Sequence, residues 1–166
     1  QPGRGTHSIV SYLPDRTCLD ENMKVADLID FFSDFYRDFD RVKATEMLNT
    51  LNLSSLSRLK ALSKGNREKV QLILTMSRRA QLYILDEPIA GVDPAARDYI
   101  LNTILANYSE DASVLLSTHL IADIERVLDE VVFLKEGSMV LHEGVDTIRE
   151  EHGKSVDMLF REVFSC

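Results

Sequence analysis

The sequence has little of several features that mark particular classes of protein. No apolar run approaches the roughly 18 residues that a membrane-spanning helix needs. Lysine and arginine form no dense run and the formal net charge is −8, so tracking along a nucleic acid backbone gets no electrostatic support. The two cysteines, Cys18 and Cys166, are far apart and match no metal-ligand spacing. We therefore expect reduced thiols, a cytosolic protein and no nucleic acid partner.

The size and composition are those of a folded domain. The chain has 166 residues, of which 45% are hydrophobic, and this suits one domain or one domain with an inserted subdomain. Residues 1–5 read Q-P-G-R-G, contain no methionine and resemble an interrupted loop rather than a natural amino terminus. We therefore expect the chain to be part of a longer protein.

Residues 82–88, L-Y-I-L-D-E-P, form the stretch around which the other motifs are arranged. Four apolar residues in a row predict a strand buried on both faces of a parallel sheet, and Pro88 should end it. Asp86 and Glu87 would then lie at the carboxyl end of a central strand, where open α/β sheets bind ligands. The sequence thus suggests that Asp86 serves a metal ion and Glu87 a water molecule. Two solvated acids in a loop are the alternative.

The remaining pattern alternates strands with helices and predicts an α/β fold with a parallel sheet. A wholly helical block at residues 20–64 looks like an insertion into that sheet, with one helix at 24–39 and a second starting at Asp40. The other expected elements are strands at 8–13 and 113–117, the latter buried, helices at 67–79 and 94–107, a helix after His119, a hairpin of strands 130–135 and 138–142, and one or two amphipathic helices in 145–166.

Two further groups of residues carry possible chemistry. Thr118-His119 follows the strand at 113–117, so it should reach the same sheet edge as the two acids, although a lone histidine is more often a surface or capping residue. Ser63-Lys64-Gly65-Asn66 opens a helix, and free amides with the helix dipole make such a start an anion site. An ordinary capped helix start is the simpler interpretation of this second group.

Taken together, these stretches resemble the motifs of ATP-binding cassette (ABC) ATPases, the nucleotide-binding domains of ABC transporters. Residues 62–66, L-S-K-G-N, are similar to the LSGGQ signature, with Lys64 for glycine and Asn66 for glutamine. The other matches are residues 82–86 to Walker B, Glu87 to the catalytic glutamate, residues 90–93 to the D-loop, Thr118-His119 to the switch-histidine loop, and residues 12–15 to the start of the Q-loop. Their order and spacing agree over nearly the whole chain.

The resemblance implies a P-loop NTPase (RecA-like) sheet with an inserted α-helical subdomain, and ATP and Mg²⁺ as ligands. In such a protein Ser63, Gly65 and Asn66 contact the γ-phosphate of ATP held by a partner subunit, and Lys64 adds a cation beside it. Asp86 orders Mg²⁺ through water, and Glu87 activates the attacking water.

Three more residues gain a role from the same resemblance. His119 would hydrogen-bond the γ-phosphate, although on its own it would more often be a surface residue. Asp93 would couple the two ATP sites across a dimer, although capping the helix that Pro94 opens explains it equally well. Asp15 would link metal and water to a permease, but it stands where the family usually has glutamine or glutamate and reaches less far than glutamine.

The largest departure from the family is an absence. The sequence contains no G-x-x-x-x-G-K-[ST], the Walker A loop that cradles phosphates. In the family this loop lies upstream of the Q-loop. We therefore expect a carboxyl-terminal fragment, inactive by itself, of an ATPase. Its expected parts are 1–19, core strand and Q-loop; 20–80, helical subdomain; 81–144, catalytic subdomain; and 145–166, helical tail.

The resemblance favours the ATPase subunit of an ABC transporter over two alternatives. Such a subunit works with a separate transmembrane permease, pairs head to tail with itself or a related ATPase, and sits at the inner face of the membrane. Local sequence is most similar to bacterial export-type members that handle peptides, antibiotics or lipids. The alternatives are an ABC ATPase acting in DNA repair or on ribosomes, and an inert interaction module.

Overall fold

The computed structural model describes residues 3–90, 92, 94–108 and 111–164. The chain forms two compact units, residues 1–118 and residues 119–166, and each unit is described by itself. In the part of the chain that the structure describes, no helix has the length and apolar character needed to cross a membrane. The finer division into four parts stays a prediction.

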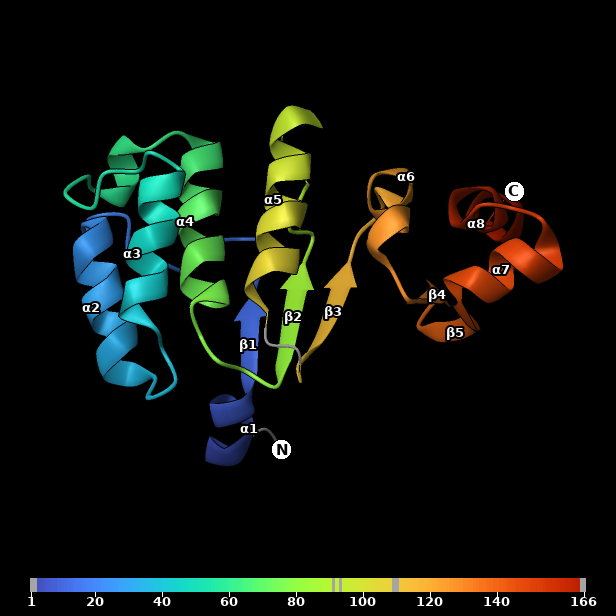
Figure 1. The fold of residues 1–166 in the computed structure, drawn as a ribbon, viewed down its shortest axis with the longest axis horizontal. Helices are drawn as coiled ribbons and strands as arrows, with labels where there is room; N and C mark the ends of the chain where they lie inside the picture. The colour runs from blue at the N-terminus through green and yellow to red at the C-terminus, as the bar shows by residue number, and fades with distance from the viewer. Residues whose placement is uncertain (1–2, 91, 93, 109–110, 165–166) are drawn as a thin grey trace. The chain divides into compact units, whose positions relative to one another are not determined.

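The first unit is built on three parallel strands, β1 (Val10–Leu13), β2 (Leu82–Asp86) and β3 (Ser113–Ser117), in the order β1-β2-β3 (Figure 1). This confirms the parallel sheet expected from the sequence. The register pairs Leu13 with Leu85 and Asp86 with Ser117. The carboxyl ends of all three strands therefore lie at one edge of the sheet, and β2 is in the middle.

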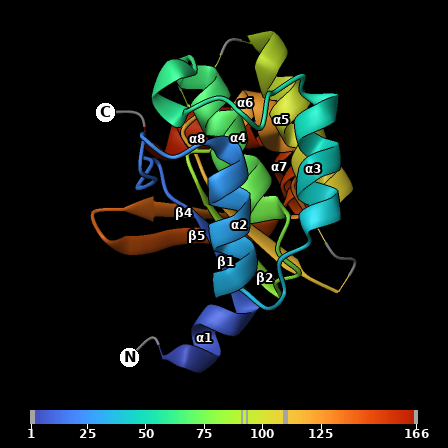
Figure 2. The ribbon, with the colours of Figure 1, turned by 90° about the vertical axis from the view of Figure 1, so that its left-hand side faces the viewer.

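The sheet of the first unit is accompanied by six helical segments among the described residues. Three of them, α2, α3 and α4, pack against one another as a helical block, and α4 also contacts β1 and α5 (Figures 1 and 2). Their bounds, with those of the other helices of the unit, are α1 Arg4–Ile9, α2 Val25–Phe35, α3 Arg41–Thr50, the 3₁₀ turn η1 Leu59–Ala61, α4 Lys64–Met76 and α5 Pro94–Asn107. The inserted block predicted from the sequence is thus built of helices joined by turns and short extended segments.

The two faces of the sheet are unequally covered. On β2, Tyr83 and Leu85 are almost fully buried, whereas Leu82 and Ile84 on the other face are half-buried. On β3, Leu115 is 58% exposed. The expectation of a buried strand is therefore wrong for β3, because β3 pairs only with β2 among the described strands. An apolar run indicates a strand but does not tell how much of it is covered.

Several helix ends differ from the expected ones. Helix α2 stops at Phe35 rather than residue 39, because Tyr36 is extended, although Phe39 still packs on Phe32 with ring centroids 5.9 Å apart. The strand expected at residue 8 begins only at Val10, after α1. Helix α4 begins three residues before the expected start, because Ser63 caps it.

The second unit contains an antiparallel hairpin covered by short helices. Its elements are α6 Ile121–Ile124, the 3₁₀ turn η2 Glu125–Val127, β4 Glu130–Lys135, β5 Ser138–Gly144, α7 Val145–His152 and α8 Val156–Phe164. Glu136 and Gly137 both have positive φ, +50° and +78°, which gives the primed turn that matches strand twist and confirms the predicted hairpin. Phe133, Ile148 and Leu159 belong to its buried core.

Candidate functional site

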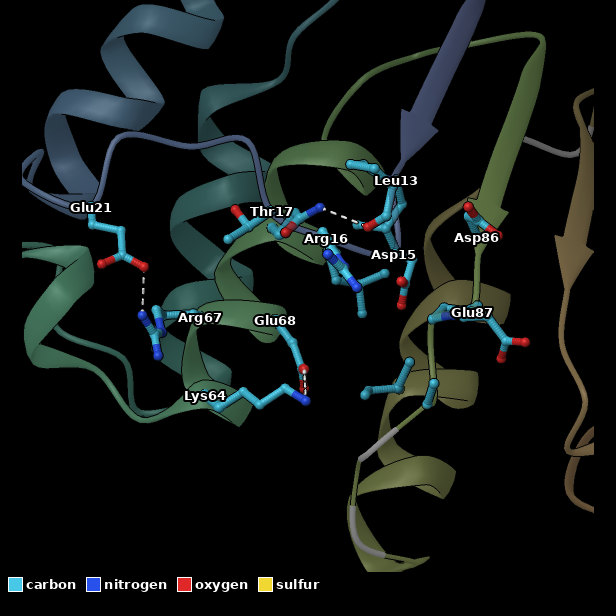
Figure 3. A pocket seen from close by; sticks show the side chains of 16 residues that line it. Leu13, Asp15, Arg16, Thr17, Glu21, Lys64, Arg67, Glu68, Asp86 and Glu87 are labelled. Atoms are coloured by element: carbon cyan, nitrogen blue, oxygen red, sulfur yellow. Dashed lines mark hydrogen bonds and ion pairs between the residues drawn. The ribbon is translucent and has the colours of Figure 1, made fainter.

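A cavity of about 530 Å³ opens at the carboxyl ends of β1 and β2, beside the first turns of α4 (Figure 3). Four of the predicted site residues line it: Asp15 after β1, Lys64 at the start of α4, and Asp86 and Glu87 at the end of β2. The structure thus brings these four residues to one cavity, and their roles stay predictions. They come from three separate segments of the chain.

Asp86 and Glu87 are both half-buried where β2 ends. The Asp86 carboxylate accepts a hydrogen bond from the Ser117 hydroxyl, with 2.6 Å between Oδ1 and Oγ. The Glu87 amide donates to the Ser117 carbonyl at 3.0 Å. Glu87 has a φ of +48°, in the left-handed region that non-glycine residues rarely adopt. In Figure 3 its carboxylate points away from Lys64 and Glu68.

The four signature residues occupy the N-cap and first turn of α4. The Ser63 hydroxyl accepts a hydrogen bond from the Asn66 amide, with 3.3 Å between Oγ and N. Ser63 is therefore an ordinary N-cap as well as a candidate anion ligand. A Cβ placed on Gly65 would have nothing within 4 Å, so the backbone there is open to approach. Only Lys64 of the four lines the cavity. Ser63, Gly65 and Asn66 are thus placed at an open helix start outside it.

Several charged residues that the sequence reasoning missed also line the cavity. Glu68, one turn after Lys64, has its Oε1 atom 3.7 Å from Lys64 Nζ, and Arg67 pairs with Glu21 at 2.7 Å. Burial raises the pKa of Glu68, and the Lys64 ammonium offsets only part of that rise. Glu68 could have been found from the sequence, because residues four apart on a helix lie side by side and Glu68 is four residues after Lys64. Arg67 and Glu21 belong to segments whose proximity only the fold reveals.

The donor set suits Mg²⁺ only as part of a larger site. Mg²⁺ keeps several waters and is usually held by one or two carboxylates plus substrate phosphates. Asp86 and Asp15 can supply such carboxylates from one cavity. Within the described ranges, no group of three or more acidic, histidine or cysteine side chains is arranged to hold a metal ion. The residues therefore fit a cation that arrives with a phosphate ligand.

The structure does not test two further predicted site residues, His119 and Asp93. Thr118 closes the first unit and His119 opens the second, so the predicted approach of His119 to the phosphate stays a prediction. Asp93 lies outside the described residues, and its coupling role also stays a prediction.

Comparison with known proteins identifies the family. The profile described as "ABC transporter" matches residues 3–90. The ABC transporter ATP-binding protein YtrB of Bacillus subtilis is 28% identical over 91% of this chain and 52% of its own length. The uncharacterized ABC transporter ATP-binding protein MJ1023 of Methanocaldococcus jannaschii is 33% identical over 84% of this chain and 55% of its own length. The chain spans about half the length of these relatives.

Solved structures agree with the sequence matches. A structure described as the ATP-binding subunit of an ABC transporter superposes with a TM-score of 0.83 at 27% identity, covering 96% of this chain and 70% of that one. A second, the ATP-binding protein of a putative ABC transporter from Pyrococcus furiosus, has a TM-score of 0.61 at 23% identity over 69% of this chain and 58% of that one, and shares the fold. The fold is thus that of a P-loop NTPase, and the chain belongs to the ABC transporter family and has the ATP-binding domain of that family.

Proposed function

We propose that this chain is the carboxyl-terminal part of the ATP-hydrolysing subunit of an ABC transporter. The observation that carries the proposal is the meeting of Asp15, Asp86 and Glu87 at one cavity. Three carboxylates at the carboxyl edge of a parallel sheet suit the binding of a phosphate-bound cation and the activation of a water molecule, as phosphoryl transfer to water requires. The Walker A loop that this chain lacks would come from residues that precede it in the complete protein.

Each of these residues has a task that its position allows. Asp86 would hold the water shell of Mg²⁺. Asp15, at the end of β1, would link this metal and water to the permease. Glu87 would orient and deprotonate the attacking water from the exit of β2. Bound Mg²⁺ would neutralise charge on the phosphates. The open start of α4, with Ser63, Lys64, Gly65 and Asn66, would bind the γ-phosphate of an ATP molecule held by a second subunit.

Substitution of Glu87 by glutamine in the complete protein tests this function. We expect Glu87→Gln to lower kcat for ATP hydrolysis by at least about 100-fold, because the amide cannot accept the water proton. ATP binding should persist, since the amide keeps the size of the carboxylate. Glu150→Gln on the exposed surface of α7 is the control for loss of one charge. Hydrolysis at the wild-type rate by Glu87→Gln would rule out the proposed role.

The partners follow from the same proposal. The complete subunit would pair head to tail with a second ATPase subunit and would bind the cytoplasmic side of a separate permease, at the inner face of the cell membrane. Cosedimentation of the complete protein with membranes that contain the permease, and its release when the permease is deleted, would support this. Retention on nucleic acid instead would favour the DNA-repair or ribosome alternative.

A further inference from the structure

Ser117, the last residue of β3, lies directly opposite Asp86 in the sheet. The register pairs the two residues across β2 and β3, so their side chains leave the same face. The distance of 2.6 Å between Ser117 Oγ and Asp86 Oδ1 is that of a charge-assisted O–H···O⁻ hydrogen bond. A hydroxyl has one proton to donate, and Ser117 gives it to Asp86. The Asp86 carboxylate is therefore tied to the neighbouring strand.

The same serine also holds Glu87 through its backbone. The Glu87 amide points at Ser117 and is shared between the Ser117 carbonyl at 3.0 Å and the Ser117 hydroxyl at 3.3 Å. The hydroxyl thus accepts from one acid's backbone while it donates to the other acid's side chain. One side chain bridges the two consecutive acids at the end of β2.

The bridge matters because Glu87 has an unfavourable backbone conformation. At a φ of +48° a residue with a side chain is in an unfavourable backbone conformation, which contacts with the surroundings must offset. The Ser117 carbonyl and hydroxyl contact the amide of this same residue. The direction of the Glu87 side chain depends on that peptide orientation, and Figure 3 shows its carboxylate turned away from Lys64 and Glu68.

We propose that Ser117 is a positioning residue for hydrolysis: its hydroxyl fixes the Asp86 carboxylate and the Glu87 backbone together, so that the groups serving cation and water keep a set separation. This inference rests on the proposed function of Asp86 and Glu87. Ser117 is not among the residues that line the cavity, so it would act through Asp86 and Glu87. The hydroxyl is the required group, so threonine should replace serine and alanine should not.

A first experiment measures positioning without activity. In Ser117→Ala, NMR couplings should show the Asp86 side chain averaging over rotamers, and the Glu87 amide, which keeps the Ser117 carbonyl but loses the hydroxyl, should exchange with deuterium a few-fold faster. Ser117→Thr should restore both readouts. Ser113→Ala is the matched control, because Ser113 is exposed on the same face of the same strand.

A second experiment measures the consequence in the complete protein. We expect Ser117→Ala to lower kcat about tenfold with little change in KM for ATP, because binding groups stay in place while the reacting geometry loosens. Ser117→Thr should recover most of kcat, which excludes simple misfolding of the alanine variant. Ser113→Ala should match the wild type.

The two proposals fail in different ways. If Ser117→Ala leaves the Asp86 rotamer and Glu87 exchange unchanged, or loosens both with kcat unaltered, the positioning role is overturned. If Glu87→Gln hydrolyses ATP normally, the proposed function fails by itself, and the two NMR readouts still decide whether Ser117 holds the two acids.

Discussion

Glu68 has a carboxylate that is held partly out of water. Its side chain is 30% exposed, but Oε2 is buried and has no hydrogen-bond partner among the described residues. The Lys64 ammonium that pairs with the other oxygen is itself 74% exposed, so solvent screens the pair. Burial therefore outweighs the attraction and raises the pKa of Glu68 above its ordinary value of 4.5.

This raised pKa predicts a pH-dependent stability. The folded chain binds the Glu68 proton more tightly than the unfolded chain, so the associated stability is present below pH 4.5 and is lost as pH rises through the folded-state pKa. We expect Glu68→Gln to raise the free energy of unfolding at pH 7 by less than about 1 kcal/mol, because exposure and the Lys64 pair limit the gain.

Urea denaturation of the chain as a function of pH checks this prediction. The advantage of Glu68→Gln should shrink towards zero below pH 4.5. Glu46→Gln, which removes an exposed carboxylate from α3, is the control for the change in net charge. Equal gains in both variants at pH 7 would show that total charge rather than burial is responsible.

At the scale of elements, Arg78 joins segments that are distant in sequence. Its side chain is 4% exposed and pairs with Asp38, between α2 and α3, at 3.0 Å. It also donates to the His7 carbonyl at 2.9 Å and the Val10 carbonyl at 2.6 Å, and it lies 3.9 Å above the ring centroid of Tyr36. The helical block is thereby fastened to the start of β1.

Replacing Arg78 should loosen this attachment. Arg78→Lys keeps the charge but cannot reproduce the planar set of donors, so we expect a loss of about 2–3 kcal/mol in the free energy of unfolding. Arg79→Lys is the neighbouring control: its side chain is 77% exposed, and we expect a change of less than about 0.5 kcal/mol. Urea denaturation of the two variants compares them, and equal losses would contradict the assigned role of Arg78.

These elements also show what the sequence could predict. The run from Leu82 to Asp86 before Pro88, and the Asp-Pro start of α5, are local signals, and the structure places β2 and α5 where they indicate. Ser117 was missed because its contact with Asp86 joins residues 31 positions apart, and only the strand register creates it. The sequence pattern predicts a longer helix α2 than the structure has, because Phe39 continues the apolar spacing without being helical.

At the scale of the whole molecule, the two acids at the end of β2 and the open start of α4 belong to different halves of the proposed reaction. Asp86 and Glu87 would act on ATP bound by their own subunit. Ser63, Gly65 and Asn66 lie outside the cavity, at an open helix start, and would act on ATP bound by a second subunit. Dimer formation should therefore depend on the helix start even when the acids are altered.

A double variant separates the cap of α4 from its phosphate role. Aspartate caps helices as well as serine does, so Ser63→Asp should keep α4 stable, whereas Ser63→Ala should lose about 1 kcal/mol. The carboxylate would repel a γ-phosphate. We therefore expect the complete Glu87→Gln protein to form an ATP-dependent dimer, and the added Ser63→Asp to abolish it while the melting temperature stays unchanged.

Light scattering after size-exclusion chromatography, with and without ATP, measures this dimer. Glu87→Gln combined with Glu150→Gln is the control, since it removes a charge from exposed α7 and should still dimerise. Persistence of the dimer with Ser63→Asp would contradict a phosphate contact at the start of α4, because an added carboxylate at that position is incompatible with a bound phosphate. Loss of the dimer in a folded protein would place the second half of the ATP site at Ser63.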